Sequence, residues 1–290
     1  SAKGRARGPP AGAAKPGCYD PERGAKVIAR ANAFLDQAVP LASGSHADVK
    51  QWSVVNGALS PALANPSLFA GYRGDPANPD AVLLRHHGLG IELVIDRAHS
   101  IGKDDPAGRA DVILEAALTT IVDLEDSIAA VDADDKVAAY SNWLGLMRGD
   151  LEATFAKGSR QMTRKLEADR VWKAPNDSEF TLPGRAVLFV RNVGHLMTTP
   201  AVKLADGTEA PEGIIDALVT SLIGMHDLKG LGRYRNSRTD SIYIVKPKMH
   251  GPKEAAFANR LFDAVEDVLG LARHTLKLGL MDEERRTSAN

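Results

Sequence analysis

The sequence has a single cysteine, almost no net charge and no long apolar run. Cys18 is the one cysteine among 290 residues, which excludes an internal disulfide framework and indicates a reducing compartment. No apolar stretch approaches the roughly 20 residues that are needed to span a bilayer. The formal net charge is -1, so no overall electrostatic field attracts nucleic acid or a membrane surface. We therefore expect a cytoplasmic chain that has neither nucleic acid nor a membrane as its partner.

Several familiar motifs are also missing. We find no internal repeat, no glycine-rich nucleotide-binding pattern after an apolar run, no zinc-ligand spacing and no serine nucleophile elbow. Residues 1–16 are basic and rich in Gly, Ala and Pro, and they lack the apolar core of a secretory signal. This composition predicts a loose N-terminal segment.

Four apolar runs in the sequence each end in charged residues. They are "TTIVDLEDS", "AVLFVRNVGHLM", "SIYIVKPKMHG" and "LKLGLMDEERR". Amphipathic helical patterns separate them, over residues 132–147, over residues 211–228 and between Gly251-Pro252 and Gly270. Apolar strands that alternate with helices predict an α/β fold in which helices cover a parallel sheet.

The position of Arg191 at the end of an apolar run points to a site. A β/α barrel and an open doubly wound sheet both bind ligands at the C-terminal ends of their strands. Arg191 is therefore predicted to lie at a catalytic mouth. Only about four barrel strands can be counted, whereas a closed barrel needs eight. Either the chain stops within a barrel or the sheet is open.

The rest of the chain has a different pattern. Asp20 predicts the start of a helix over residues 19–40, and residues 50–100 predict antiparallel strands. Residues 106–118 predict a helix, and residues 150–185 are polar and rich in turns, as in an insertion. The helix over residues 132–147 is predicted to have one apolar face, formed by Ala133, Val137, Tyr140, Leu144 and Met147.

The acidic residues of the charged clusters are candidate metal ligands. If the strands are neighbours, these acids meet at one rim, and oxygen-rich rims of this kind bind Mg²⁺. The acids are Asp123, Glu125, Asp126, Asp282, Glu283 and Glu284. The alternative is a structural network in which the same acids pair with Lys248, Arg285 or Arg286.

Basic side chains at the strand ends are candidates for binding and catalysis. Arg191 favours an anionic substrate and negative charge on oxygen, or it forms a salt bridge with an acid of the first run. His195 and His250 are candidates for a general acid or base, or else for hydrogen bonds to neighbouring carbonyl groups. Cys18 has no pattern of charged partners, so we do not expect it to be a nucleophile.

Four long stretches resemble malate synthase of the G isoform. They are "TTIVDLEDSIAAVDADDKV", "LFVRNVGHLM", "RNSRTDSIYIVKPKMHGP" and "MDEERRTSAN", and the resemblance runs from about Gly17 to Asn290. It implies a partial β/α (TIM-type) barrel and an inserted α/β domain with antiparallel strands. The inserted domain is expected over residues 17–118 and 150–185, and the barrel over residues 119–149 and 186–290.

The resemblance also implies an activity and its residues. Malate synthases condense glyoxylate with acetyl-CoA through an enolate to give malate and free CoA, in the glyoxylate cycle, and they use Mg²⁺. By resemblance, Arg191 contacts glyoxylate and stabilises the enolate oxygen, and Glu283 is a direct Mg²⁺ ligand that borders glyoxylate. The remaining positions carried over are Asp123 and Glu125 near the waters of the metal, and Ser127 and Arg164 in contact with acetyl-CoA.

Part of the family's machinery is expected outside these 290 residues. The second protein ligand of Mg²⁺ and the catalytic aspartate of the family lie beyond the position of Asn290, so we expect a piece of a longer enzyme that is inactive alone and needs the missing C-terminal part. Two rival interpretations stay open. One is a Mg²⁺-dependent malyl-CoA or citryl-CoA lyase on the same barrel, and the other is a non-catalytic fragment that binds a ligand.

Overall fold

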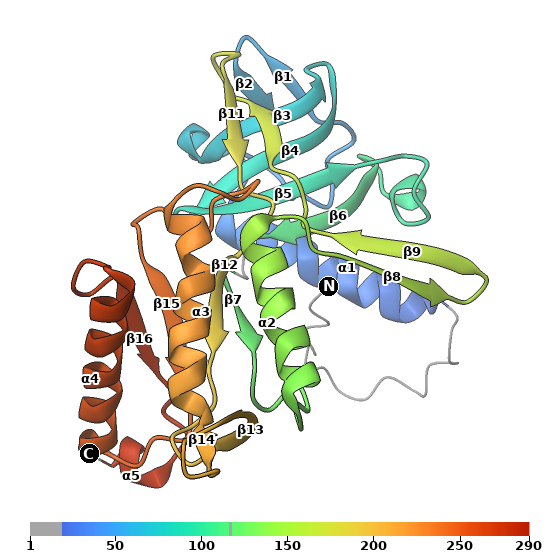
Figure 1. Ribbon diagram of the computed structural model, residues 1–290. Coiled ribbons are helices and arrows are strands. Elements are labelled where there is room, and N and C mark those ends of the chain that lie inside the picture. Colours follow the sequence, from blue (N-terminus) through green and yellow to red (C-terminus); the bar gives the residue numbers. More distant parts are fainter. Residues whose placement is uncertain (1–18, 116–117, 290) are drawn as a thin grey trace. The chain divides into compact units, whose positions relative to one another are not determined.

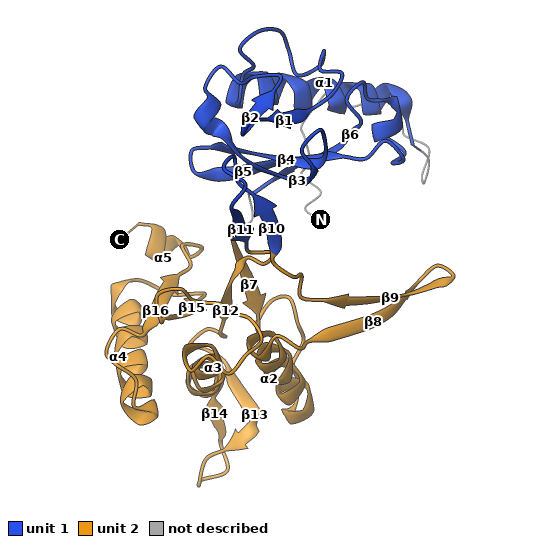
Figure 2. Ribbon diagram, turned by 90° about the horizontal axis from the view of Figure 1, so that it is seen from above, with its two compact units in different colours: residues 1–116, 170–182 blue, residues 117–169, 183–290 orange. Residues whose placement is uncertain are grey.

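The computed structural model describes residues 19–115 and 118–289, which form two compact units (Figures 1 and 2). Unit 1 comprises Ser1–Ala116 and Arg170–Leu182, and unit 2 comprises Ala117–Asp169 and Pro183–Asn290. The chain thus leaves unit 1 once and returns to it for a short segment. Of the polar stretch 150–185, only the part from Arg170 to Leu182 belongs to unit 1.

Unit 1 is an antiparallel sheet with a long helix. The order of the strands in the sheet is β11-β10-β3-β4-β5-β6, and every neighbouring pair is antiparallel. The elements of this unit are α1 (Pro21–Ala38), β1 (Ser53–Val55), β2 (Ala58–Ser60), η1 (Pro66–Leu68), β3 (Phe69–Asp75), β4 (Asn78–His86), β5 (Leu89–Ile95), η2 (Gly102–Asp104), β6 (Arg109–Leu114), β10 (Arg170–Lys173) and β11 (Glu179–Leu182).

Two local predictions for unit 1 are confirmed, the start of α1 and the turn between β1 and β2. The Asp20 carboxylate accepts hydrogen bonds from the amides of Glu22 and Arg23, which caps α1 as predicted. Asn56 and Gly57 have φ values of 50° and 78° and join β1 to β2, as expected for a two-residue hairpin turn.

The helix predicted over residues 106–118 is wrong, because β6 occupies most of that stretch. β6 pairs with β5, and Val112 lies opposite Leu93 in the ladder. The apolar residues of this segment fit a helical spacing, but cross-strand pairing with β5 outweighs that local preference.

Unit 2 is built on a parallel sheet of four strands in the order β16-β15-β12-β7. Helices α2, α3 and α4 cover one of its faces (Figure 1). The elements of this unit are β7 (Thr119–Asp123), α2 (Ala133–Arg148), β8 (Glu152–Lys157), β9 (Arg160–Lys165), β12 (Val187–Arg191), β13 (Thr198–Lys203), β14 (Glu209–Pro211), α3 (Glu212–Leu228), β15 (Ile242–Lys246), α4 (Pro252–Leu269), β16 (Leu276–Leu280) and α5 (Arg285–Ser288).

The core of unit 2 lies between the sheet and the three helices. Val190 and Ile244 on the central strands are fully buried, and they belong to one cluster with Trp143 of α2 and Phe262 of α4. Burial of side chains of this size contributes about 1.5–3 kcal/mol each. The sheet does not close into a ring among the described residues, so β7 and β16 are its edges.

The helices of unit 2 begin and end largely where the sequence predicts. α4 starts at Pro252 and ends before Gly270, whose φ of 66° is the left-handed conformation of a helix C-terminus. The predicted apolar face of α2 is correct in part, because Met147 is buried and Tyr140 and Leu144 pack against the core. Val137 does not belong to it, since its side chain is 61% exposed. The buried residues of the helix are Lys136, Ala139, Trp143 and Met147.

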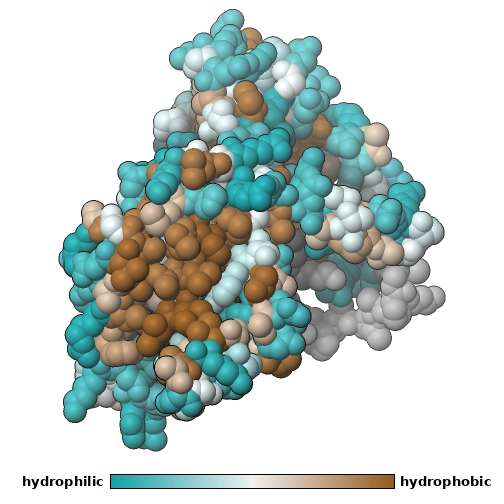
Figure 3. Space-filling view, in the orientation of Figure 1, coloured by the Kyte–Doolittle hydropathy of each residue, from teal (hydrophilic) through white to brown (hydrophobic). Residues whose placement is uncertain are grey.

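The outer surface of α3 is apolar. Ile214 and Leu222 are 41% and 52% exposed, and Figure 3 shows brown, apolar side chains gathered over this helix. No helix in the described part of the chain is both long and apolar enough to cross a lipid bilayer.

Candidate functional site

The C-terminal ends of the four parallel strands form one rim of unit 2. In the register of the sheet, Arg191 lies opposite Asp123 of β7 on one side and Val245 of β15 on the other. Val245 in turn lies opposite Gly279 of β16. The charged clusters that follow these strands are therefore neighbours, as the sequence predicts.

Arg191 and Asp123 form a buried ion pair at this rim. The Nε of Arg191 donates to Oδ1 of Asp123 at 2.7 Å, and its Nη2 donates to Oδ2. The two side chains are only 9% and 11% exposed. Nη2 also lies 3.2 Å from Asp126, whereas Nη1 makes one weak contact among the described residues, at 3.5 Å with the sulfur of Met281.

Asp123 uses both carboxylate oxygens within the protein. Besides Arg191, Oδ1 accepts a hydrogen bond from the amide of Glu125, and Oδ2 accepts from the amide and the hydroxyl of Ser127. Burial alone would raise the pKa of Asp123, but the hydrogen bonds from Arg191 and Ser127 hold that pKa well below its usual range. The carboxylate is thus charged near neutral pH and orients Arg191.

Lys248 links the acids of the first and last strands. Its Nζ lies 2.8 Å from Asp126 and 3.1 Å from Oε2 of Glu125, and its backbone amide donates to Oε1 of Glu283 at 2.8 Å. The hydrogen bond with Asp126 raises the pKa of Lys248. A φ of 52° at Lys248 turns the chain so that its side chain and its amide serve different acids.

Two ion pairs and one hydrogen bond from a backbone amide therefore connect Arg191 to Glu283. The sequence of contacts runs from Arg191 to Asp126, then to Lys248, and then to Glu283. The Oε2 atom of Glu125 is buried and accepts no hydrogen bond of normal geometry, although the ammonium of Lys248 lies in ion-pair range. Across residues 19–115 and 118–289, no three acidic, histidine or cysteine side chains converge as a metal cage.

Of the other predicted residues, Ser127 lies in the rim and Arg164 does not. The hydroxyl of Ser127 donates to Asp123 at 2.6 Å. Arg164 lies on β9, which forms a two-stranded sheet with β8, and its guanidinium lies over the ring of Phe155 at 4.9 Å. The two-stranded β8–β9 ribbon projects from the rest of unit 2 (Figure 2).

The two histidines lie beside the rim, and only His250 is within ion-pair range of one of the predicted acids in the described part of the chain. The ring of His195 packs edge-on against Phe257 at 4.9 Å, and its Nε2 is buried without a hydrogen-bond partner. Burial lowers the pKa of His195, and the charge of Lys246 adds to this effect. His250 lies 4.0 Å from Glu284 and is half-exposed. Cys18 lies outside the described residues.

Sequence reasoning missed a buried polar network behind the rim. Asp216 of α3 is fully buried and lies 2.8 Å from Nζ of Lys136, which is itself 2% exposed. Lys246 is 1% exposed and donates to the carbonyl of Val193 at 2.5 Å. One signal of this network in the sequence is that Lys136 and Asp216 each lie on a helical face that is otherwise apolar.

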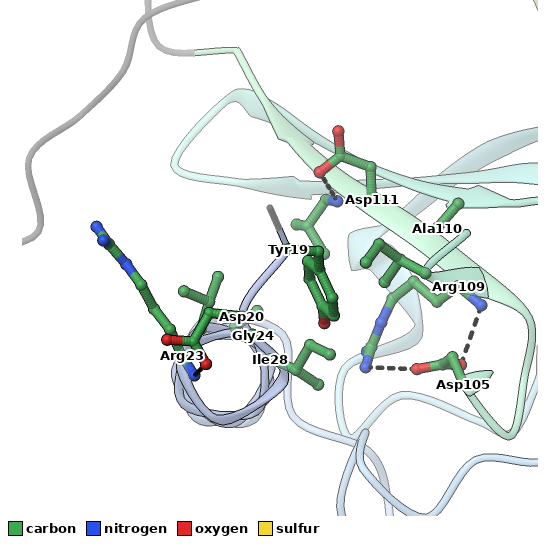
Figure 4. Close-up of a pocket in the computed structure, with 13 residues that line it drawn as sticks. Tyr19, Asp20, Arg23, Gly24, Ile28, Asp105, Arg109, Ala110 and Asp111 are labelled. Carbon is green, nitrogen blue, oxygen red and sulfur yellow. Dashed lines mark hydrogen bonds and ion pairs between the residues drawn. The ribbon is translucent and has the colours of Figure 1, made fainter. Parts of the chain in front are cut away.

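Unit 1 contains a separate groove, of about 530 Å³, between α1 and β6 (Figure 4). Its walls are mostly apolar, and its three aspartates accept hydrogen bonds from backbone amides. Arg109 bonds to Asp105 and Asn32, and Asp111 accepts a hydrogen bond from Val112. The groove holds none of the residues that the sequence predicts for the site.

Two protein-family models match the chain. The model of the malate synthase G alpha-beta insertion domain matches residues 19–86, within unit 1. The model of the malate synthase TIM barrel domain matches residues 187–290, within unit 2. The open sheet of unit 2 is thus part of a β/α barrel, and the predicted fold class is confirmed.

Curated relatives extend the match to almost the whole chain. Malate synthase G of Halalkalibacterium halodurans is 55% identical over 287 residues, which are 96% of this chain and 40% of the relative. Malate synthase G of Corynebacterium glutamicum is 51% identical over 286 residues, 96% of this chain and 39% of the relative. Malate synthase G of Corynebacterium efficiens is 51% identical over 279 residues, which are 94% of this chain and 37% of the relative.

The chain spans about 40% of the length of the curated relatives that it matches. Both domain matches and the long alignments point to one family. The chain belongs to the malate synthase G family.

Proposed function

We propose that this chain supplies the glyoxylate-binding rim of a malate synthase, which condenses glyoxylate with acetyl-CoA and releases malate and free CoA. The observation that carries the proposal is the continuous set of contacts from Arg191 through Lys248 to Glu283 at one edge of the sheet. The names of the relatives support the same reaction. Its place in the glyoxylate cycle and its cytoplasmic location are parts of the proposal.

Arg191 is the group that binds the anion. Asp123 engages Nε and Nη2, which fixes the guanidinium plane, while Nη1 has only the sulfur of Met281 within reach among the described residues. Nη1 is therefore free to donate to a carboxylate or to an enolate oxygen. A donor that is oriented in advance toward developing negative charge contributes about 3–4 kcal/mol to the transition state.

The rim fits Mg²⁺ through the chemistry of its donors. Mg²⁺ prefers oxygen ligands and binds through one or two carboxylates while it keeps several waters. Glu283 would be the direct ligand through Oε2, because Oε1 accepts the amide of Lys248. When bound, the metal supplies Lewis-acid polarisation of the aldehyde carbonyl of glyoxylate.

The two acids of the first strand have different roles in this proposal. Asp123 has five donors on its two oxygens, so it positions Arg191 rather than waters of the metal. Glu125 keeps one buried oxygen without a hydrogen bond of normal geometry, so Glu125 would hold a metal-bound water. Ser127 and Arg164 would contact acetyl-CoA, Arg164 from the projecting β8–β9 ribbon.

A chimera tests the proposed activity. In malate synthase G of H. halodurans, the stretch aligned with this chain is replaced by this chain, and the other part of the relative is kept. The assay measures the release of free thiol from acetyl-CoA in the presence of glyoxylate and Mg²⁺. We expect turnover, and Arg191→Gln should lower kcat by about 100- to 1,000-fold, as for the loss of one oxyanion donor.

The matched control is Arg273→Gln, an exposed arginine of the same unit that pairs with Asp267 at 2.6 Å. It should leave kcat unchanged. Full activity of the Arg191→Gln chimera would remove the proposed role of the rim. Consumption of glyoxylate with an intact CoA thioester would instead identify a lyase, because only a synthase releases the free thiol.

A further inference from the structure

The backbone of Val193 is held on both sides by buried charged side chains. Its amide donates to Oδ2 of Asp216 at 2.9 Å, and its carbonyl accepts from Nζ of Lys246 at 2.5 Å. Val193, Asp216 and Lys246 are 3%, 0% and 1% exposed. Burying a charge is costly unless it is well bonded. Water could satisfy the amide and the carbonyl of a loop residue without that cost, so two buried charges on Val193 indicate that its position matters.

Lys246 reaches Val193 from the helix-covered side of the sheet. Alternate residues of a strand point to opposite faces, and Lys246 follows Ile242 and Ile244, which pack in the core beneath the helices. A Cβ atom on Gly213, in the first turn of α3, would lie 2.5 Å from Nζ. Lys246 therefore does not face the ligand side, and the absence of a side chain at Gly213 makes room for its ammonium.

Asp216 is fixed in turn by two donors from α2. Its Oδ1 accepts from the hydroxyl of Tyr140 at 2.6 Å and lies 2.8 Å from Nζ of Lys136. Lys136 also lies 2.5 Å from Glu212 at the start of α3. Because Asp216 and Lys136 are both buried, Asp216 cannot turn away from Val193 without leaving a charge unpaired.

The segment that these residues hold connects two parts of the rim. The segment is residues 192–194, and Arg191 comes directly before it. The amide of Asn192 donates to the carbonyl of Val245 at 3.1 Å, and the amide of Gly194 donates to Oε1 of Glu125 at 3.1 Å. A shift of Val193 would therefore move both the end of β12 and the donor that orients Glu125.

We propose that Lys246 and Asp216 are positioning residues, which clamp Val193 so that Arg191 and Glu125 keep their orientation toward the substrate. The catalytic consequence rests on the proposed function, whereas the clamp itself is a property of the described chain. Neither residue touches the ligand side of the rim.

Amide exchange on the 290-residue chain tests the clamp without any reaction. Lys246→Met removes the ammonium and keeps the length of the side chain, and Gly213→Ala displaces the ammonium while its charge remains. Both variants should accelerate exchange at Val193 and Gly194, measured by NMR, by about tenfold, the loss expected for one hydrogen bond. Lys277→Met is the matched control, because Lys277 also donates to a backbone carbonyl, that of His274, but on the exposed surface.

Kinetics of the chimera test the positioning role. A displaced guanidinium should lower kcat by about 10- to 100-fold in Lys246→Met and Gly213→Ala. The KM for acetyl-CoA should stay the same, because the clamp does not hold the residues assigned to that substrate. A role in stability alone would lower the melting temperature and leave kcat per folded molecule unchanged.

The outcomes separate the two proposals. Unchanged exchange at Val193 and Gly194 in both variants overturns the clamp, and faster exchange with an unchanged kcat overturns its positioning role. If the chimera without substitutions is inactive, the proposed function fails, and the exchange experiment alone then decides whether the clamp exists.

Discussion

Replacing Asp123 by Asn should destabilise unit 2 far more than the same change at Asp126. Both aspartates pair with Arg191, but Asp123 is 11% exposed and Asp126 is 55% exposed. Removing one partner of a buried pair costs about 3–5 kcal/mol, because the other charge is left uncompensated. Asn keeps one acceptor oxygen, so we expect a loss near the lower limit, about 3 kcal/mol. For Asp126→Asn we expect a far smaller loss, because water screens an exposed ion pair.

Urea denaturation followed by circular dichroism measures these losses. Hydrogen–deuterium exchange of peptides from β7 and β12 assigns them to unit 2. For a unit of this size, a loss of about 3 kcal/mol corresponds to a fall of roughly 6–12 °C in the melting temperature. Equal losses in the two variants would refute the conclusion that burial of the Arg191–Asp123 pair gives it its strength.

The same variant makes a prediction about pH. The pKa of Asp123 is lowered in the folded state, so its contribution is present above the unfolded value of 3.8. That contribution is lost as the pH falls below this value toward the folded-state pKa. The stability difference between the wild-type chain and Asp123→Asn should therefore be largest near neutral pH and shrink below about pH 4. A difference that stays constant from pH 7 to pH 3 would contradict the assignment.

Three further changes have distinct expected results. Burial lowers the pKa of Lys246 from 10.5 to about 8, so between these pH values the unfolded chain binds a proton that the folded chain does not. The unfolding free energy of the wild-type chain should therefore rise relative to that of Lys246→Met as the pH increases from 8 to 10.5, as measured by urea titrations. Gly57→Ala should lower the free energy of unfolding by well over the roughly 1 kcal/mol expected for Gly88→Ala, as checked by thermal melts. Both glycines have a positive φ, but a Cβ at Gly57 would lie 2.3 Å from the backbone oxygen of Pro175, whereas a Cβ at Gly88 would have open space. Ile121→Lys should reduce self-association in sedimentation velocity, because it places a charge on the exposed edge strand β7.

The sequence predicts the ends of helices and strands where neighbouring residues along the chain determine them. Gly251-Pro252 and Gly270 predict the limits of α4 because each residue suits the backbone conformation at one end of a helix. The strand ends were found because apolar runs stop abruptly at charges such as Asp123 and Arg191. Their meeting at one rim follows from the parallel order of the sheet.

Features that depend on contacts between distant segments were not predictable. β6 was interpreted as a helix because its spacing fits one, and only pairing with β5 decides the outcome. The link from Lys248 to Glu283 depends on a left-handed residue in a loop, which no residue type in "KPKMHG" requires. The exposure of Val137 on α2 was not predictable either, because the buried face includes Lys136, a residue type that an apolar pattern excludes.

The distinction between the two faces of the sheet explains why charges at strand ends have two different roles. Arg191 and Lys246 occupy the last positions of β12 and β15, yet Arg191 lies opposite Val245, so the two are one residue out of register. Because successive side chains point to opposite faces, Arg191 and Lys246 fall on opposite sides of the sheet. Arg191 thus joins the acids of the rim, whereas Lys246 reaches beneath α3 to the carbonyl of Val193. Whether a charge at the end of such a strand can bind a ligand or must support the backbone is therefore decided by the register, which residue type alone does not reveal.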